Sequence, residues 1–327
     1  ITQQLVVVAS STLQSLVAYI VNPTTLELQS AGLANITTQG FTPNSVALYV
    51  SPSSGRVFAF AGSTTGTVWQ FELTGPTDGG TASNLVRTLN VGGAVAGLVV
   101  DDAQSTLYVV QQNTGIWQYG AEPNAADART SVDTVTGGGL AQPLGGVALY
   151  APPGGRGYLL AVSGGANEVR VYDRAPTAHT FRGRFTLVTN GNIDAVENPR
   201  HLVVSNRALG TRFPLGLVAV QDGLNTAANE NFKLVPWTAI SGQFTPNLLV
   251  DTGAEQPGTT DGGTPDAGAD GGGGTPPIGP PGGRPGSSPD GFDYGSDGCS
   301  CSSVSMSSTV LFVLAGVLLL SRRRRRS

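Results

Sequence analysis

Few residues in this sequence have types and spacings that could do chemistry. The two histidines, His179 and His201, show no triad or metal-ligand spacing, and we expect both at the surface. The sequence contains no nucleophile elbow, phosphate-binding loop or zinc motif. The two cysteines, Cys299 and Cys301, are separated by one residue, so a disulfide between them would be strained, and two thiols do not complete a four-ligand zinc site.

The carboxylates are the remaining candidates, and several of them stand where turns are expected. Asp101 and Asp102 directly follow an apolar strand, and Asp222 lies in a Gln-Asp-Gly sequence. Asp and Gly are typical turn residues, so these positions are also open to a purely structural explanation. Arg87 has a similar alternative, as a solvated residue of a strand.

The charge balance argues against nucleic acid as a partner. Five of the 18 basic residues form the run Arg322–Arg326, and Lys233 is the only lysine. The other 13 basic residues face 22 acidic ones. Neutralising a phosphate backbone needs a basic face, which this composition does not supply.

The stretch from Ala94 to Pro123 shows the kind of element that must position these residues. It predicts three short strands, at 97–100, 106–111 and 115–119, because β-branched and aromatic residues alternate with turn residues. Such an antiparallel unit cannot bury its apolar faces alone and therefore needs neighbours of the same kind.

Those neighbours are visible as an internal repeat. Val46-Ala47-Leu48-Tyr49 recurs 101 residues later as Val147-Ala148-Leu149-Tyr150, and the turns and strands that follow are in the same order. Looser copies begin near Leu5 and Leu202. A repeat of about 50 residues built from short strands is typical of a β-propeller. A long β-sandwich with coincidental similarity is the alternative.

Composition divides the chain into three parts. Residues 1–247 alternate short strands and turns and form the predicted propeller, with a short helical turn after Pro236. Residues 248–298 are rich in Gly, Pro and Asp, so we expect a disordered linker that cannot offset its ordering entropy by burial. Residues 299–327 combine a Cys motif, an apolar run and an Arg-rich end.

This last part has the composition of a membrane anchor. The run Val310–Leu320 is strongly apolar, and with weaker positions before it the stretch is close to the minimum that spans a bilayer. Arg322–Arg326 should stay cytoplasmic. The chain opens with Ile1 and shows no export signal, so we interpret it as a mature or truncated chain.

The tail resembles the myxobacterial C-terminal sorting signal. The matching features are Gly298, Cys299 and Cys301, the apolar run and the Arg cluster. The resemblance implies processing beside the Cys motif by a membrane protease and display at the cell surface of a Gram-negative envelope. The chain would thus be exported, membrane-anchored and then exposed at the surface. A plain tail anchor is the alternative.

Five stretches of residues 5–240 resemble the β-propeller phytase family, the calcium-dependent 3-phytases. In order they are Gly115–Pro123, Gly157–Ala161, Val171–Arg174, Val220–Gly223 and Asn231–Trp237. The resemblance implies a six-bladed propeller, of which about five blades are visible and the first is missing. It also implies phytate or a related phosphate ester as substrate.

The family's chemistry uses calcium held by carboxylates, with basic residues on a second phosphate. At the family's acidic positions this chain has Ala96, Gln111, Gln112, Gly145, Arg200 and Val203; Asn44 and Thr64 replace a Tyr and a Lys near the site. The resemblance leaves Asp101, Asp102, Asp194 and Asp222 as candidate calcium ligands and Arg87 as a candidate phosphate-binding residue.

Two functional hypotheses follow. The first is a surface-anchored phosphomonoester hydrolase related to the phytases. The second is a non-catalytic propeller that serves as a surface binding or display module, since several family carboxylates are replaced. Fold alone does not choose between them.

Overall fold

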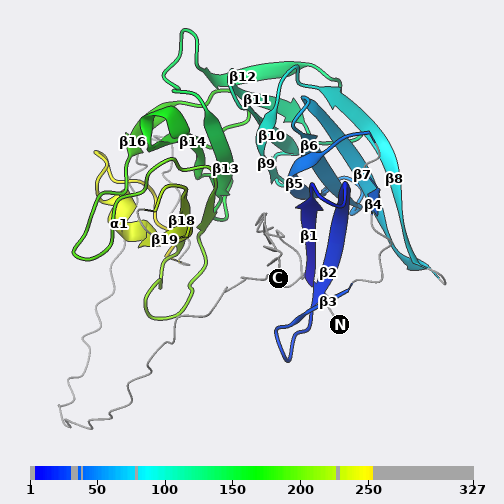
Figure 1. Cartoon of the computed structure of the whole chain (residues 1–327), viewed down its shortest axis with the longest axis horizontal. Coiled ribbons are helices and arrows are strands. Elements are labelled where there is room, and N and C mark those ends of the chain that lie inside the picture. The colour runs from blue at the N-terminus through cyan, green and yellow to red at the C-terminus, as the bar shows by residue number, and fades with distance from the viewer. Residues whose placement is uncertain (1–3, 31–35, 38–39, 78–79, 226–228, 253–327) are drawn as a thin grey trace, which may run out of the picture. The chain divides into compact units, whose positions relative to one another are not determined.

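The computed structural model describes residues 4–30, 36–37, 40–77, 80–225 and 229–252 of the chain. Within them the chain forms five antiparallel β-sheets, which we call blades 1 to 5 in chain order, and almost no helix (Figure 1). The all-β propeller predicted from the repeat is therefore confirmed, with five blades in the described residues. The predicted linker beyond residue 252 and the predicted tail lie outside these residues.

Each blade is a run of consecutive strands. Blade 1 contains β1 (Gln4–Ser10), β2 (Ser15–Val21), β3 (Leu28–Ser30) and β4 (Ile36–Thr37), and blade 2 contains β5 (Pro43–Val50), β6 (Val57–Ser63), β7 (Thr67–Thr77) and β8 (Gly80–Asn90). Blade 3 contains β9 (Val95–Asp101), β10 (Thr106–Gln111), β11 (Gly115–Gly120) and β12 (Arg129–Thr134). Blade 4 contains β13 (Leu144–Tyr150), β14 (Tyr158–Ser163), β15 (Glu168–Asp173) and β16 (Phe181–Phe185). Blade 5 contains β17 (Leu202–Ser205), β18 (Leu217–Asp222) and β19 (Asn231–Pro236).

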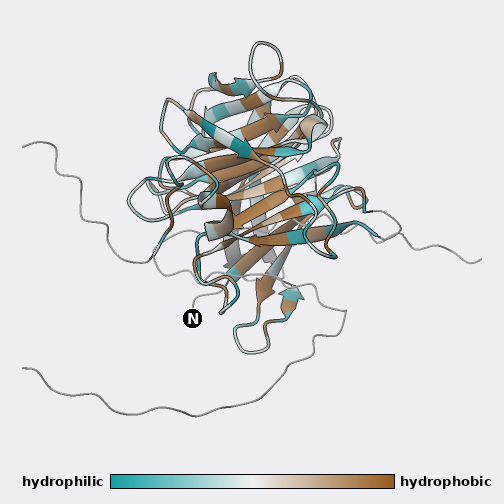
Figure 2. Cartoon of the chain, turned by 90° about the vertical axis from the view of Figure 1, so that its left-hand side faces the viewer, coloured by the Kyte–Doolittle hydropathy of each residue, from teal (hydrophilic) through white to brown (hydrophobic). Residues whose placement is uncertain are grey.

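The apolar residues of these strands form the core between neighbouring blades. The first strands of successive blades, β1, β5, β9, β13 and β17, contact one another in that order. Each of four buried clusters draws its side chains chiefly from two adjacent blades, as when Val109 of β10 packs with Phe60 of β6. Figure 2 shows hydrophobic residues concentrated in the strands and hydrophilic ones in the connecting loops. Apolar burial thus stabilises each blade through its neighbours.

Close approach of the first strands depends on glycine. A Cβ added to Gly97 of β9 would lie 2.9 Å from Gly146 Cα of β13, and one added to Gly145 would lie 2.4 Å from the carbonyl oxygen of Arg200. The absent side chains let Gly146 N donate a 2.6 Å hydrogen bond to Arg200 O, which joins blade 4 to the chain entering blade 5. The three blades therefore meet in a fixed register.

The first strands give the propeller two rims. We call the end at which β5, β9, β13 and β17 begin the N-terminal rim, and the end at which they finish the C-terminal rim. In blade 3, Val95 pairs with Gln111 at the N-terminal rim and Asp101 pairs with Thr106 at the C-terminal rim. The seven residues of β9 separate the two rims by about 20 Å at the usual rise of a strand.

The chain returns to blade 4 after blade 5. The short helix α1 (Trp237–Ser241) follows β19 and buries Trp237, whose ring stacks on Tyr150 at 4.1 Å between centroids. Trp237 Nε1 donates to Leu249 O at 2.8 Å, and Tyr150 Oη accepts from Asp251 N at 2.7 Å. Leu248 is buried. Residues 248–251, which the composition assigned to the linker, therefore contact the propeller.

Candidate functional site

Three charged residues meet at the N-terminal rim of blade 5. Asp222, the last residue of β18, is fully buried, and Lys233 of β19 lies 3.2 Å from its Oδ2. Lys233 also pairs with Asp194, in the segment between β16 and β17. The other oxygen of Asp222, Oδ1, accepts a hydrogen bond from Glu197 N at 3.0 Å. One ammonium group therefore bridges two carboxylates, leaves the three residues with one net negative charge, and fastens the segment that contains Asp194.

The protonation states of this cluster follow from its contacts. The hydrogen bond from Lys233 lowers the pKa of Asp194. Burial disfavours the charged form of Lys233, but its interactions with Asp194 and Asp222 outweigh burial and raise its pKa. The cluster is thus a stable arrangement of opposite charges, with Lys233 protonated at neutral pH. Nearby, burial and then the charge of Arg200 lower the pKa of His201.

Lys233 is a site residue that the sequence-based expectations did not single out. It is the only lysine of the chain, and its neighbours Phe232 and Leu234 are 59% and 53% exposed while Lys233 itself is largely covered. Strand residues alternate between faces, so Lys233 must turn its side chain away from solvent. An isolated lysine between two outward-facing apolar residues is the signal that could have identified it.

The positions that the family resemblance implied for metal ligands also gather at the N-terminal rim. Ala96 is the second residue of β9, Gly145 is the second of β13, and Gln111 ends β10. Gln111 Oε1 accepts from Trp117 Nε1 at 2.8 Å, and Asn44 Nδ2 donates to Val95 O at 3.0 Å. The amide groups of Gln111 and Asn44 are therefore used within the protein.

These residues do not fit a calcium site as they stand. Calcium needs six to eight oxygen ligands and several carboxylates. Lys233 already pairs with both Asp194 and Asp222, and the described part of the chain contains no group of three Asp, Glu, His or Cys residues placed to hold a metal. Arg200, whose carbonyl oxygen accepts from Gly146 N at this rim, is exposed and adds a second positive charge to the rim.

The other two predicted ligands lie at the opposite rim. Asp101 ends β9, and its carboxylate is only 1% exposed because Arg174 of blade 4 covers it in a bidentate ion pair. Asp102 Oδ1 accepts from Val50 N of blade 2 at 3.3 Å. Both residues connect blade 3 to its neighbours. The structure thus brings Asp194 and Asp222 together and keeps Asp101 and Asp102 apart from them.

Arg87 is an interblade residue in this structure. Its side chain is 5% exposed, and its Nη1 atom donates to Gly120 O at 2.8 Å and to Glu122 O at 3.2 Å. Nη2 donates to Ala126 O at 2.8 Å, and Nε pairs with Asp127. With its donors used in this way, Arg87 holds blade 2 to blade 3, and its role in phosphate binding stays a prediction.

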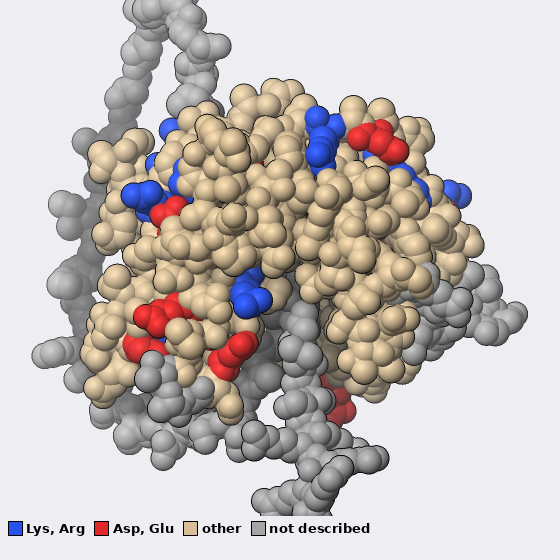
Figure 3. Space-filling model, turned by 45° about the horizontal axis from the view of Figure 1, so that its top comes forward, with Lys and Arg blue, Asp and Glu red and all other residues tan. Residues whose placement is uncertain are grey.

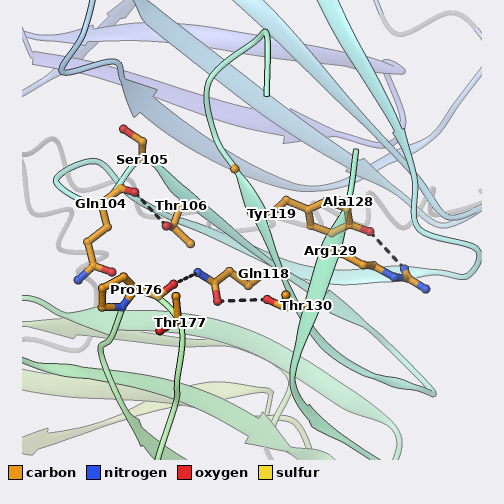
Figure 4. Close-up of a pocket in the computed structure, with 11 residues that line it drawn as sticks. Gln104, Ser105, Thr106, Gln118, Tyr119, Ala128, Arg129, Thr130, Pro176 and Thr177 are labelled. Atoms are coloured by element: carbon orange, nitrogen blue, oxygen red, sulfur yellow. Dashed lines mark hydrogen bonds between the residues drawn. The ribbon is translucent and has the colours of Figure 1, made fainter. Parts of the chain in front are cut away.

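A cavity of about 360 Å³ lies at the C-terminal rim of blade 3 (Figure 4). Its wall includes Gln118, whose Nε2 donates to Pro176 O at 2.6 Å and whose Oε1 accepts from Thr130 Oγ1. His179, half-buried against the Tyr108 ring, also contacts Gln118 Oε1 at 3.0 Å. The polar groups of Gln118 are therefore engaged, and we assign no role to this cavity.

The face shown in Figure 3 has no large patch of a single charge, because its basic and acidic side chains lie in small groups. This agrees with the composition. Among the residues that the structure describes, no helix is long and apolar enough to cross a membrane. The predicted anchor (Val310, Leu320, Arg322 and Arg326) and the predicted processing motif (Gly298, Cys299 and Cys301) lie outside those residues.

Five four- or three-stranded blades with a polar N-terminal rim define a protein of the β-propeller class. Residues 16–257 match the family model described as Phytase. The chain is also 31% identical over 198 residues to a 3-phytase from Bacillus subtilis (strain 168), which covers 59% of this chain and 52% of that protein. The chain thus spans about half the length of that relative. It belongs to the phytase family.

Proposed function

We propose that this chain is a phytase-like phosphomonoester hydrolase, directed at phytate or a related phosphate ester, whose calcium-dependent turnover is weak. The observation that supports the substrate class is the family match over residues 16–257. The observation that supports weak turnover is the pairing of Asp194 and Asp222 with Lys233. A metal would have to displace the Lys233 ammonium group from these two carboxylates or bind through the one negative charge that remains.

Two residues at the N-terminal rim have roles in the proposed function. Arg200 is exposed and has no ion-pair partner among the described residues, so it is the basic group that can contact a substrate phosphate there. Guanidinium groups bind phosphate through paired hydrogen bonds. Lys233 holds Asp194 in place and thereby fixes the segment that presents Arg200. In the family, calcium supplies an activated water and screens the phosphates.

The experiment is phosphate release from phytate by the full chain, with millimolar calcium and with a chelator. We expect slow release or none, and little change in melting temperature on adding calcium, since no described group of ligands binds it strongly. Turnover comparable to that of the Bacillus relative, or a large thermal stabilisation by calcium, would contradict this proposal.

A second candidate function is a non-catalytic binding module that keeps the propeller and has lost hydrolysis. The specific observation that favours it is that Asp194 and Asp222 pair with Lys233 at one rim and Asp101 pairs with Arg174 at the other. Phytate binding without phosphate release, weakened by Arg200→Gln, would support this function. Release above the uncatalysed rate that is lost in the same variant would support the hydrolase.

For the tail we propose surface display after processing beside Cys299, with Val310–Leu320 as a transient membrane anchor and a sorting protease as partner. The support is the order of the Cys motif, apolar run and Arg cluster in the sequence. Replacing Arg322–Arg326 by Ser should reduce retention or reverse orientation. Unchanged surface display of that variant would argue that the Arg cluster is not required.

A further inference from the structure

A second cavity, of about 260 Å³, lies at the C-terminal rim of blade 4 and contains three arginines. Arg156, Arg174 and Arg182 line it together with one acid, Asp173, and with the Tyr158 and Leu249 residues of its wall. It is on the opposite rim from Asp222, because Tyr158 begins β14 and pairs with Tyr150, the last residue of β13. The chain has a formal net charge of −4, so a cavity lined by three arginines and one acid differs in charge from the protein as a whole.

Two of the three arginines are fixed in place. Arg174 is almost completely buried, pairs with Asp101 and donates from Nη1 to Arg156 O at 3.1 Å. Its backbone N also donates to Gly157 O at 2.9 Å. Arg182 Nε donates to Asp173 Oδ1 at 2.7 Å. Arg174 therefore holds the turn that carries Arg156, and Asp173 aligns Arg182.

The remaining donors are free. Arg156 is exposed, and no hydrogen bond or ion pair engages its guanidinium within the described residues. Arg182 uses only Nε, so both of its Nη atoms are available, and its side chain is 45% exposed. Asp101 balances Arg174 and Asp173 balances Arg182, which leaves the charge of Arg156 uncompensated. The cavity thus has one net positive charge and several unused N–H donors.

We infer that this cavity binds a small phosphate group, as free phosphate or on a phosphorylated small molecule, through Arg156 and Arg182. Each guanidinium presents its N–H groups in a planar fork that fits two oxygens of a phosphate. Tyr158 Oη accepts from Leu249 N at 2.8 Å and keeps its own proton for a third contact. The inference does not depend on hydrolysis, on calcium or on the N-terminal rim.

The test is titration of the full chain with inorganic phosphate in a chelator-containing buffer, followed by calorimetry. We expect saturable binding with one site of this kind, which Arg156→Gln and Arg182→Gln each weaken by about tenfold or more, as expected for loss of a charged hydrogen bond. The matched control is Arg207→Gln, which removes the same charge from an exposed residue outside the cavity and should leave the affinity within about twofold.

Three results would overturn the inference. They are the absence of saturable phosphate binding, binding that neither Arg156→Gln nor Arg182→Gln weakens, and an equal loss in Arg207→Gln. A fourth contrary result would come from acetate as a second probe: equal affinity for acetate would show that the cavity binds anions with no preference for phosphate. Arg156 has no internal partner among the described residues, so its replacement should leave folding intact, which thermal unfolding checks.

Discussion

Asp101 and Arg174 form a bidentate ion pair that joins blade 3 to blade 4, with Arg174 Nε 2.5 Å from Oδ2 and Nη2 2.7 Å from Oδ1 of Asp101. Both side chains are almost completely buried. Their charges were removed from water on folding, so each depends on the other for compensation. The pair therefore fixes how two neighbouring blades meet.

Replacing Asp101 by Asn should destabilise the protein by about 3–5 kcal/mol, because it leaves the Arg174 charge buried without a partner. The measurement is urea unfolding. The matched control is Asp173→Asn, which breaks the more exposed pair with Arg182 and should cost less than about 1 kcal/mol. Equal and small losses in both variants would show that the buried pair does not hold the blades.

Replacing Lys233 by Met should destabilise the protein by about 3 kcal/mol, because Asp222 would remain fully buried without a counter-charge. The double variant Asp222→Asn/Lys233→Met should recover part of this loss, since the unpaired charge is then gone. Unfolding curves of the two variants give the comparison. A double variant no more stable than Lys233→Met would mean that Lys233 acts through packing.

Asp102 should make stability depend on pH. Burial raises the pKa of its carboxyl to about 7, against the opposing effect of the Val50 amide and with a further contribution from the charge of Asp101. The unfolded carboxyl has a pKa of about 3.9, so the folded state holds the proton more tightly between these values. Stability should therefore fall as pH rises from about 4 to about 7.

The variant Asp102→Asn removes this titration and keeps an oxygen to accept from Val50 N. We expect it to be more stable than the natural protein at pH 8 by about 1–2 kcal/mol and to show a flatter pH profile. Thermal unfolding between pH 4 and pH 8 provides the test. The same slope in both proteins would assign the pH dependence to other groups.

Restoring an acid at position 145 should not restore a metal site. A Cβ there would lie 2.4 Å from Arg200 O and 2.9 Å from a methyl of Val162, so Gly145→Glu should force β13 away from the chain entering β17. Even Gly145→Ala should cost about 1–3 kcal/mol. Gly146→Ala is the control, because its nearest contact would be 3.3 Å. Similar stabilities of the two Ala variants would refute the close-approach argument.

The fold could be predicted from sequence to a greater degree than the site. The repeat of Val46–Tyr49 at Val147–Tyr150 indicated equivalent strands, and both copies lie in the second half of the first strands of their blades. The strand predicted at 106–111 is β10 with the same bounds. These features depend on residues that are close together in the sequence or that recur at a regular interval, so the sequence alone is enough to predict them.

The partners of the charged residues could not be predicted in this way. Asp101 and Arg174 are 73 residues apart, and Asp194 and Lys233 are 39 apart. Such pairs form only when blades are placed side by side, and neither turn chemistry nor alternation indicates them. The resemblance placed Asp101, Asp102, Asp194 and Asp222 in one metal-binding set, whereas Asp101 at the end of β9 and Asp102 directly after it lie at the opposite rim from Asp222.

The contacts of residues 248–251 have a mechanical consequence. Tension applied to the chain beyond residue 252 reaches the propeller first at Asp251, whose N donates to Tyr150 Oη and whose Oδ2 accepts from Asn206 Nδ2. It then reaches Leu249, whose N and O bond Tyr158 and Trp237. These bonds lie in sequence along the segment, so a pull loads them one after another. With the stacked rings of Tyr150 and Trp237, these contacts divide the load between blade 4 and the residues that follow β17 and β19 of blade 5.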